Sequence, residues 1–115
     1  MKIAYASRTG NVQSIVERLG VEDAINVVDE TTINEDYIIF TYTDGYGEVP
    51  ADVEEFVAAN AGHLKGIVCS GSKGFGDAFC GAGKVLSEQY NVPVLYEVEN
   101  EGTDEDIEKI KELIK

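Results

Sequence analysis

The chain has 115 residues, 43% hydrophobic and 27% charged, a length and composition that suit one domain and exclude collagen-like, disordered and membrane classes. Its 9 basic and 22 acidic residues give a net charge of -13, which repels nucleic acid and anionic membrane surfaces. We therefore expect a single domain over residues 1–115, with neither nucleic acid nor membrane as a partner.

Apolar runs of strand length predict five strands, at residues 3–6, 25–28, 37–42, 66–70 and 92–96. Apolar residues at helical spacing predict four helices, around residues 12–19, 53–57, 85–90 and 107–114, the last opened by a capping box of Thr103 and Asp106. Only residues 29–36 join the second and third strands, too few for a crossover helix with its loops. Strands and helices alternate elsewhere, which predicts an α/β fold, a doubly wound parallel sheet with helices on both faces.

The first loop of interest is Ser7-Arg8-Thr9-Gly10-Asn11, between the first strand and the first helix. Backbone N–H groups at a helix start, together with short polar side chains, can bind a phosphate without a metal. The loop lacks the patterns of nucleotide triphosphatases and of dinucleotide sites. Alternatively, Thr9 or Asn11 only caps the helix.

Two further loops, Thr43–Gly47 and Gly71–Asp77, each combine glycines with one aromatic residue, Tyr46 and Phe75. Loops that follow parallel strands gather at one edge of the sheet, where ligands bind. Glycine lets the backbone approach a flat ring, and aromatic side chains can flank that ring. Together with the first loop they predict a flavin site, although either aromatic residue alone could simply cover the sheet end.

Cysteine, histidine and the start of the chain receive simpler interpretations. Cys69 and Cys80 have neither CxxC spacing nor a Cys/His cluster, so no metal site is expected. Cys69 lies in an apolar run and is interpreted as a buried free thiol, whereas no role is assigned to Cys80. His63 is interpreted as a surface residue. No signal peptide pattern opens the chain, which predicts a cytoplasmic protein.

These loops resemble the NrdI family, flavodoxin-like activators of class Ib ribonucleotide reductase, over essentially the whole chain. The resemblance depends on residues 7–12, 41–50 and 70–79. It implies a five-stranded sheet of order 2-1-3-4-5 and an FMN cofactor. The implied FMN contacts are Ser7, Arg8, Thr9, Gly10, Asn11 and Val12 in the phosphate loop, Thr43, Asp44, Gly45, Tyr46 and Gly47 at the reactive edge of the ring, and Gly71, Phe75, Gly76, Asp77 and Phe79 on its other side.

The resemblance also implies a redox activator rather than a conventional turnover enzyme. In the family, reduced flavin reacts with oxygen and supplies superoxide to a dimanganese centre in the radical-bearing small subunit of the reductase. The flavin carries the chemistry, Gly45 and Tyr46 tune it, and a reductant of unknown identity supplies electrons. The acidic rim of Asp44 and Glu48 is expected to take part in docking. Two alternatives are an ordinary electron-shuttling flavodoxin and a flavin-free receiver domain, in which Asp44 would be the candidate phosphoacceptor.

The peptide between Asp44 and Gly45 is predicted to act as a switch, because glycine lets its carbonyl turn toward the ring nitrogen that gains a proton on reduction. We expect Gly45→Val to shift both one-electron potentials of the bound flavin and to leave phosphate binding nearly intact. Spectroelectrochemical titration of the variant and the wild type measures this shift. Unchanged potentials would contradict the hypothesis.

Overall fold

The computed structural model describes residues 1–29, 32–44 and 47–114, and only the backbone of Phe75 and Asp77. Its five strands form one parallel sheet of order β2-β1-β3-β4-β5, which confirms the predicted flavodoxin-like fold. In chain order the elements are β1 (Lys2–Tyr5), α1 (Asn11–Leu19), β2 (Ile25–Asn26), β3 (Tyr37–Tyr42), α2 (Ala51–Ala59), the 3-10 helix η1 (Ala61–His63), β4 (Leu64–Gly71), the 3-10 helix η2 (Lys73–Ala78), α3 (Gly81–Tyr90), β5 (Val94–Glu99) and α4 (Asp104–Leu113).

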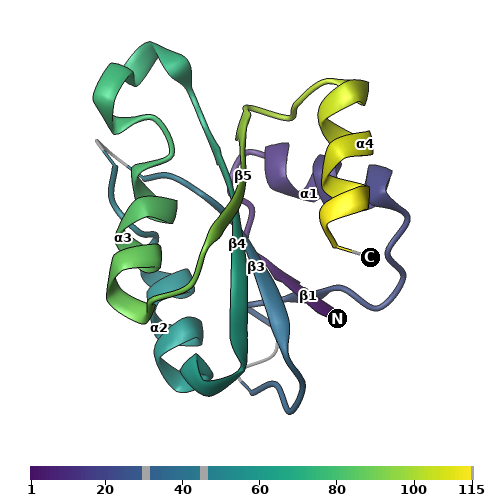
Figure 1. Ribbon diagram of the computed structural model, residues 1–115, viewed down its shortest axis with the longest axis vertical. Helices are drawn as coiled ribbons and strands as arrows, with labels where there is room; N and C mark the ends of the chain where they lie inside the picture. Colours follow the sequence, from purple (N-terminus) through teal and green to yellow (C-terminus); the bar gives the residue numbers. More distant parts are fainter. Residues whose placement is uncertain (30–31, 45–46, 115) are drawn as a thin grey trace.

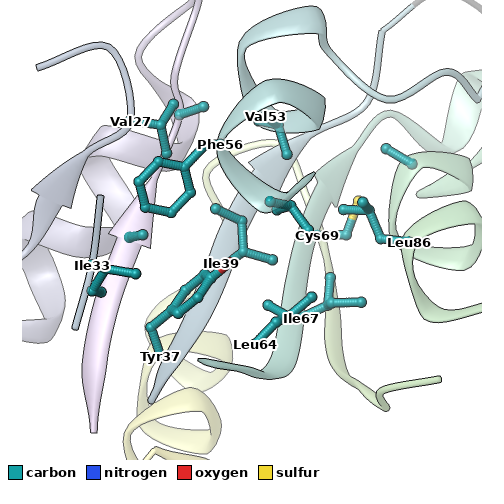
Figure 2. Close-up of a cluster of buried hydrophobic side chains, with 14 of the residues drawn as sticks. Val27, Ile33, Tyr37, Ile39, Val53, Phe56, Leu64, Ile67, Cys69 and Leu86 are labelled. Carbon is teal, nitrogen blue, oxygen red and sulfur yellow. The ribbon is translucent and has the colours of Figure 1, made fainter. Parts of the chain in front are cut away.

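Helices cover both faces of the sheet, as Figure 1 shows, with α1 and α4 on one side and α2 and α3 on the other. Strand β3 is buried on both faces, so its side chains alternate between two cores. Tyr37 and Ile39 face α2 and α3, whereas Ile38 and Phe40 face α1 and α4. In the first of these cores the ring of Tyr37 meets that of Phe56 edge-on, with centroids 5.6 Å apart (Figure 2). This double burial explains why β3 is continuously apolar.

The predicted start of α4 is confirmed in detail. The Asp106 N–H donates to Thr103 Oγ1 at 3.1 Å, and the Thr103 N–H donates to Asp106 Oδ2 at 2.8 Å, which completes the capping box. The hydroxyl of Tyr96 donates to Asp106 Oδ1 at 2.6 Å and, as the largest cause, holds the pKa of this carboxyl below its ordinary value. These contacts fix the start of α4 and join it to Tyr96 in the middle of β5. None of the helices formed by the described residues is long and apolar enough to cross a membrane.

The short connection between β2 and β3 forms no helix within its described residues, 27–29 and 32–36, as predicted. Strand β2 ends earlier than expected, because the side chain of Asn26 accepts the Val28 N–H at 3.1 Å and turns the chain. The connection is instead anchored at buried Ile33, whose N–H donates to Asn60 Oδ1 at 2.9 Å. The Asn60 side chain in turn donates to the Phe56 carbonyl at 2.8 Å. One buried amide therefore joins this connection to the end of α2.

The last strand is displaced from its predicted position at residues 92–96. Pro93 has no N–H to donate, although its carbonyl accepts the Ile67 N–H at 3.1 Å, and β5 begins only at Val94. The strand continues to Glu99 because Val98 is buried while Glu97 and Glu99 face solvent. The acidic stretch of residues 97–106, whose composition suggests a solvated loop and helix start, therefore begins as an amphipathic strand. The short helix η2 in the third loop was not predicted either.

A close backbone contact holds the segment after β3 against the start of α3. A Cβ built at Gly81 would lie 2.5 Å from the Cα of Gly47 and 2.9 Å from its carbonyl oxygen. These are main-chain atoms, which cannot rotate away as the end of a flexible side chain could. Glycine at position 81 therefore sets how closely the second loop packs on α3.

We expect Gly81→Ala to lower the free energy of unfolding by about 1–3 kcal/mol, because overpacking against backbone exceeds the roughly 1 kcal/mol that alanine gains in a helix. The matched control is Gly62→Ala in η1, where a Cβ would meet no atom within 4 Å. Its stability should stay within about 1 kcal/mol of the wild type. Urea unfolding measures both variants, and equal changes would show that the Gly47 contact imposes no constraint.

Candidate functional site

The loop after β1 enters α1 through a left-handed glycine. Gly10 is the N-cap residue of α1, with a φ of 93° that residues bearing side chains rarely adopt. Its N–H donates to Ser7 Oγ at 3.2 Å, and its carbonyl accepts the Ser14 N–H at 2.9 Å. This turn directs the first N–H groups of α1 toward the carboxyl edge of the sheet.

The start of α1 carries no side-chain cap in the described part of the chain. Gly10 has no side chain to offer, neither Thr9 nor Asn11 bonds to the helix backbone, and the first turn contains no acidic residue. The capping role that the sequence allowed for Thr9 or Asn11 is therefore not realised. The first backbone donors of the helix keep their hydrogen-bonding capacity, and the helix dipole places a partial positive charge beside them. This arrangement favours an anion.

A hollow of about 130 Å³ lies at this helix start, where the carboxyl ends of four strands converge. The Ser70 hydroxyl donates to the Asn100 carbonyl at 2.6 Å, and the Asn100 N–H donates to the Gly71 carbonyl at 2.8 Å, so the ends of β4 and β5 are held together. Three residues of the first loop line the hollow together with residues from the ends of β3, β4 and β5, namely Arg8, Thr9, Asn11, Tyr42, Thr43, Ser70, Gly71, Ser72 and Asn100.

Arg8 connects the first loop with the second. Its Nη1 lies 2.9 Å from Asp44 Oδ1, and its guanidinium carbon lies 5.2 Å from the centroid of the Tyr42 ring. Both charged side chains are substantially exposed, at 59% and 40%, so the ion pair stabilises the fold by at most about 1 kcal/mol. Burial raises the pKa of the Tyr42 phenol, with Arg8 opposing that shift. Arg8 therefore acts mainly by placing one positive charge at the mouth of the hollow.

The second loop is closed at its base by a backbone pair. The Asp44 N–H donates to the Glu48 carbonyl at 2.9 Å, and the Glu48 N–H donates to the Asp44 carbonyl at 2.8 Å. Thr43 lines the hollow and donates from Oγ1 to the Ser70 carbonyl at 3.3 Å. The predicted ring contacts Gly45 and Tyr46 lie outside the described residues. Thr43 and Asp44, on one side of them, are thus fixed by β4 and by Glu48.

The residues of the third loop that are predicted for the other side of the ring line two adjacent hollows. Gly71 lines the hollow, whereas Phe79 lines a wider one of about 630 Å³ beside β5 and α4. Gly76 has a φ of 58° and bends the chain inside η2. Phe75 and Asp77 belong to η2 by their backbone, and their side chains lie outside the described part. Gly71 and Phe79 are nevertheless neighbours, because a Cβ built at Gly71 would lie 3.4 Å from Phe79 Cδ1, and Asn100 lines both hollows.

The donors present fit a phosphate group. Hydroxyl, amide and backbone N–H groups surround the helix start together with one guanidinium, and a Cβ built at Gly10 would meet no atom within 4 Å, so there is room beside this residue. Val12 is buried in the core against α4, which leaves only its backbone N–H for a ligand. Ser7 supports the turn by accepting from Gly10.

The fold and this site define a flavodoxin-like protein that binds a flavin. A family model described as NrdI flavodoxin-like matches residues 3–112, and the chain belongs to this family. Among solved structures it is similar to a short-chain flavodoxin associated with a non-canonical PDU bacterial microcompartment, with a TM-score of 0.68 and 19% identity over 96% of this chain and 90% of that chain. At that identity the likeness shows the shared fold.

Sequence reasoning missed part of the hollow. Ser70 and Ser72 stand beside glycines that had been singled out, so their position in the third loop was a usable signal. Asn100 lies within the acidic stretch of residues 97–106, whose composition suggests only a solvated loop and helix start. Its φ of 53° places it in a left-handed turn, and an asparagine at the end of a strand is a recognised signal for such a turn. Tyr42 had been assigned only to the strand.

We expect Arg8→Gln to weaken FMN binding about two- to fivefold at low salt, because one exposed charge contributes up to about 1 kcal/mol and is screened by ions. Riboflavin, which lacks the phosphate, should bind the variant and the wild type equally. Lys65→Gln is the matched control, since it removes the same charge from an exposed residue near the opposite end of β4. Fluorescence titrations at low and high salt measure these affinities. An equal loss for FMN and riboflavin would contradict the assigned role.

Proposed function

We propose that this chain binds FMN and activates the radical-bearing small subunit of class Ib ribonucleotide reductase in the cytoplasm. When bound and reduced, FMN supplies the electron that converts oxygen to superoxide for the dimanganese centre of that subunit. The metal ions belong to the partner in this proposal, and a reductant of unknown identity delivers electrons to the protein. Membership of the NrdI flavodoxin-like family supports this assignment.

The observation that carries the cofactor assignment is the uncapped start of α1 beside a hollow lined by residues of four strand ends. A helix start whose first N–H donors have no side-chain cap among the described residues, and whose first turn has no acidic residue, favours a dianionic phosphate. Thr9 and Asn11 add short donors from the same loop. We propose that they anchor FMN by its phosphate, together with the backbone of Gly10 and Val12.

The second loop is proposed to tune the ring, with Gly45 and Tyr46 at its reactive edge. The carboxylate of Asp44 near the ring would oppose added negative charge there, because like charges repel across a few ångströms. Its ion pair with Arg8 partly neutralises this effect. The close packing of Gly47 on Gly81 fixes the far side of the loop. These residues orient the loop and set the local charge without accepting or donating a proton themselves.

The acidic rim is proposed as part of the docking face. Glu48 is exposed beside the second loop, and the chain as a whole carries a net charge of -13. Such a surface steers association with a basic partner, at rates that fall as salt rises. A charge reversal at Glu48 should therefore slow association with the small subunit.

The decisive experiment is a radical-assembly assay. The FMN-loaded protein is reduced anaerobically, mixed with a manganese-loaded class Ib small subunit and exposed to oxygen. We expect a protein radical in the small subunit by electron paramagnetic resonance, and none when free FMN at the same concentration replaces the protein.

A general one-electron flavodoxin is the competing function, because it uses the same loops for an ordinary shuttle. Such a protein would reduce a flavodoxin acceptor but would form no radical in the assay. A purified protein that is colourless and cannot be reconstituted with FMN would contradict both functions and would favour a flavin-free interaction domain.

A further inference from the structure

The two cysteines, which lie eleven positions apart in the sequence, meet beneath the candidate flavin site. Cys69 belongs to β4 and Cys80 immediately precedes α3, and both are fully buried in the core on the α2 and α3 side of the sheet. Figure 2 shows Cys69 within that core. The Cys80 thiol donates to the carbonyl oxygen of Cys69 at 3.2 Å. The two residues are therefore direct neighbours.

Two glycines allow this approach. A Cβ built at Gly71 would lie 2.9 Å from the backbone nitrogen of Cys80 and 3.4 Å from its sulfur, so the chain at Cys80 lies directly on β4. A Cβ built at Gly83 would lie 2.9 Å from the Cβ of Cys69. Cys80 itself has a φ of 53°, a left-handed conformation that is uncommon for a residue with a side chain.

The two thiols also influence each other's acidity. The side chain of Cys80 is the largest cause that lowers the pKa of the Cys69 thiol, against an opposing effect of burial, and Thr43 lowers it further. The side chain of Cys69, followed by burial, raises the pKa of the Cys80 thiol. The contacts agree with this order, because the Cys80 thiol donates its proton to the Cys69 carbonyl whereas the Cys69 sulfur lies beside the Thr43 hydroxyl, so Cys69 is taken as the attacking sulfur.

We propose that Cys69 and Cys80 form a redox-sensitive modification site, which hydrogen peroxide converts to an intrachain disulfide. The Cys69 sulfur attacks one peroxide oxygen, an S–O bond forms, the O–O bond breaks, and the leaving hydroxide takes the Cys69 proton to give water. The Cys80 sulfur then attacks the Cys69 sulfur, the S–S bond forms, and the S–O bond breaks with release of a second water that carries the Cys80 proton. Two thiols lose two electrons in total, and one peroxide is reduced to two waters.

The disulfide would act on the flavin site through two contacts. The Cys69 sulfur lies 3.2 Å from Thr43 Oγ1, and Thr43 lines the hollow at the start of α1. Gly81, the residue after Cys80, packs against Gly47 of the second loop. Joining the two sulfurs therefore disturbs this loop near both of its ends. We expect the disulfide form to bind FMN severalfold more weakly, an effect that rests on the proposed function, whereas the thiol chemistry does not.

The test treats the folded protein, with and without FMN, with hydrogen peroxide and then alkylates free thiols under denaturing conditions. We expect a mass loss of about 2 Da without alkylation, reversed by dithiothreitol. A tryptic digest should contain a cross-link between the peptides of residues 66–73 and 74–84. Cys80→Ser and Cys69→Ser serve as matched controls. Each keeps one thiol and cannot form the cross-link, and the Cys80→Ser protein should yield a sulfenic acid that dimedone traps at Cys69.

Four outcomes would overturn the proposal or one of its parts. Two alkylated thiols after treatment, or separate oxidation to sulfinic acids without a cross-link, would overturn it. A cross-link that leaves FMN affinity unchanged would refute the connection to the flavin site, with the peroxide-treated Cys80→Ser protein as reference. If no form of the protein binds FMN, the proposed function fails while the disulfide result still stands. Circular dichroism of each variant confirms that it is folded.

Discussion

The parallel pairing of β1, β3 and β4 is the constraint on which the rest of the structure depends. Ala4 pairs with Ile39, and Ile39 pairs with Ile67, so three buried strands run in one direction and end at the same edge. Each connection that leads back to the start of the next parallel strand must cross a face of the sheet. These connections place α1 on one face and α2 and α3 on the other. The loops that follow these strands therefore converge, although Arg8 of the first loop and Ser72 of the third are more than sixty residues apart along the chain.

Convergence creates a site only because the first of these loops leaves its helix uncapped. Gly10 adopts a left-handed conformation that residues with side chains rarely adopt, and it directs the backbone donors of α1 toward the carboxyl edge of the sheet. Because the first turn of α1 contains no acidic residue, the positive potential at these donors is preserved. Arg8 adds a charge and ties this loop to Asp44. Beneath the same edge, Thr43 contacts Cys69, so the proposed redox pair of cysteines touches a loop of the candidate site.

The sequence predicted what depends on local patterns. The period of Val12, Ile15 and Val16 identified α1, and residues 29–36 were too few for a helix. Local patterns do not predict long-range backbone contacts. The approach of Gly81 to Gly47 is a meeting of two main chains, for which glycine is a necessary but common residue. The later start of β5 depends on Pro93, which has no N–H to donate. The ion pair of Arg8 with Asp44 depends on the order of the strands in the sheet. The ring contacts at Gly45 and Tyr46 remain predictions.

Backbone amide shifts test whether the open start of α1 holds the phosphate of FMN. In nitrogen–proton correlation spectra of labelled protein, we expect FMN to move the amides of Gly10, Asn11 and Val12 strongly and riboflavin to move them far less. Equal shifts with both ligands would contradict this phosphate site. So would the largest FMN-specific shifts around Tyr96 and Glu99, which line the wider hollow beside β5 and α4.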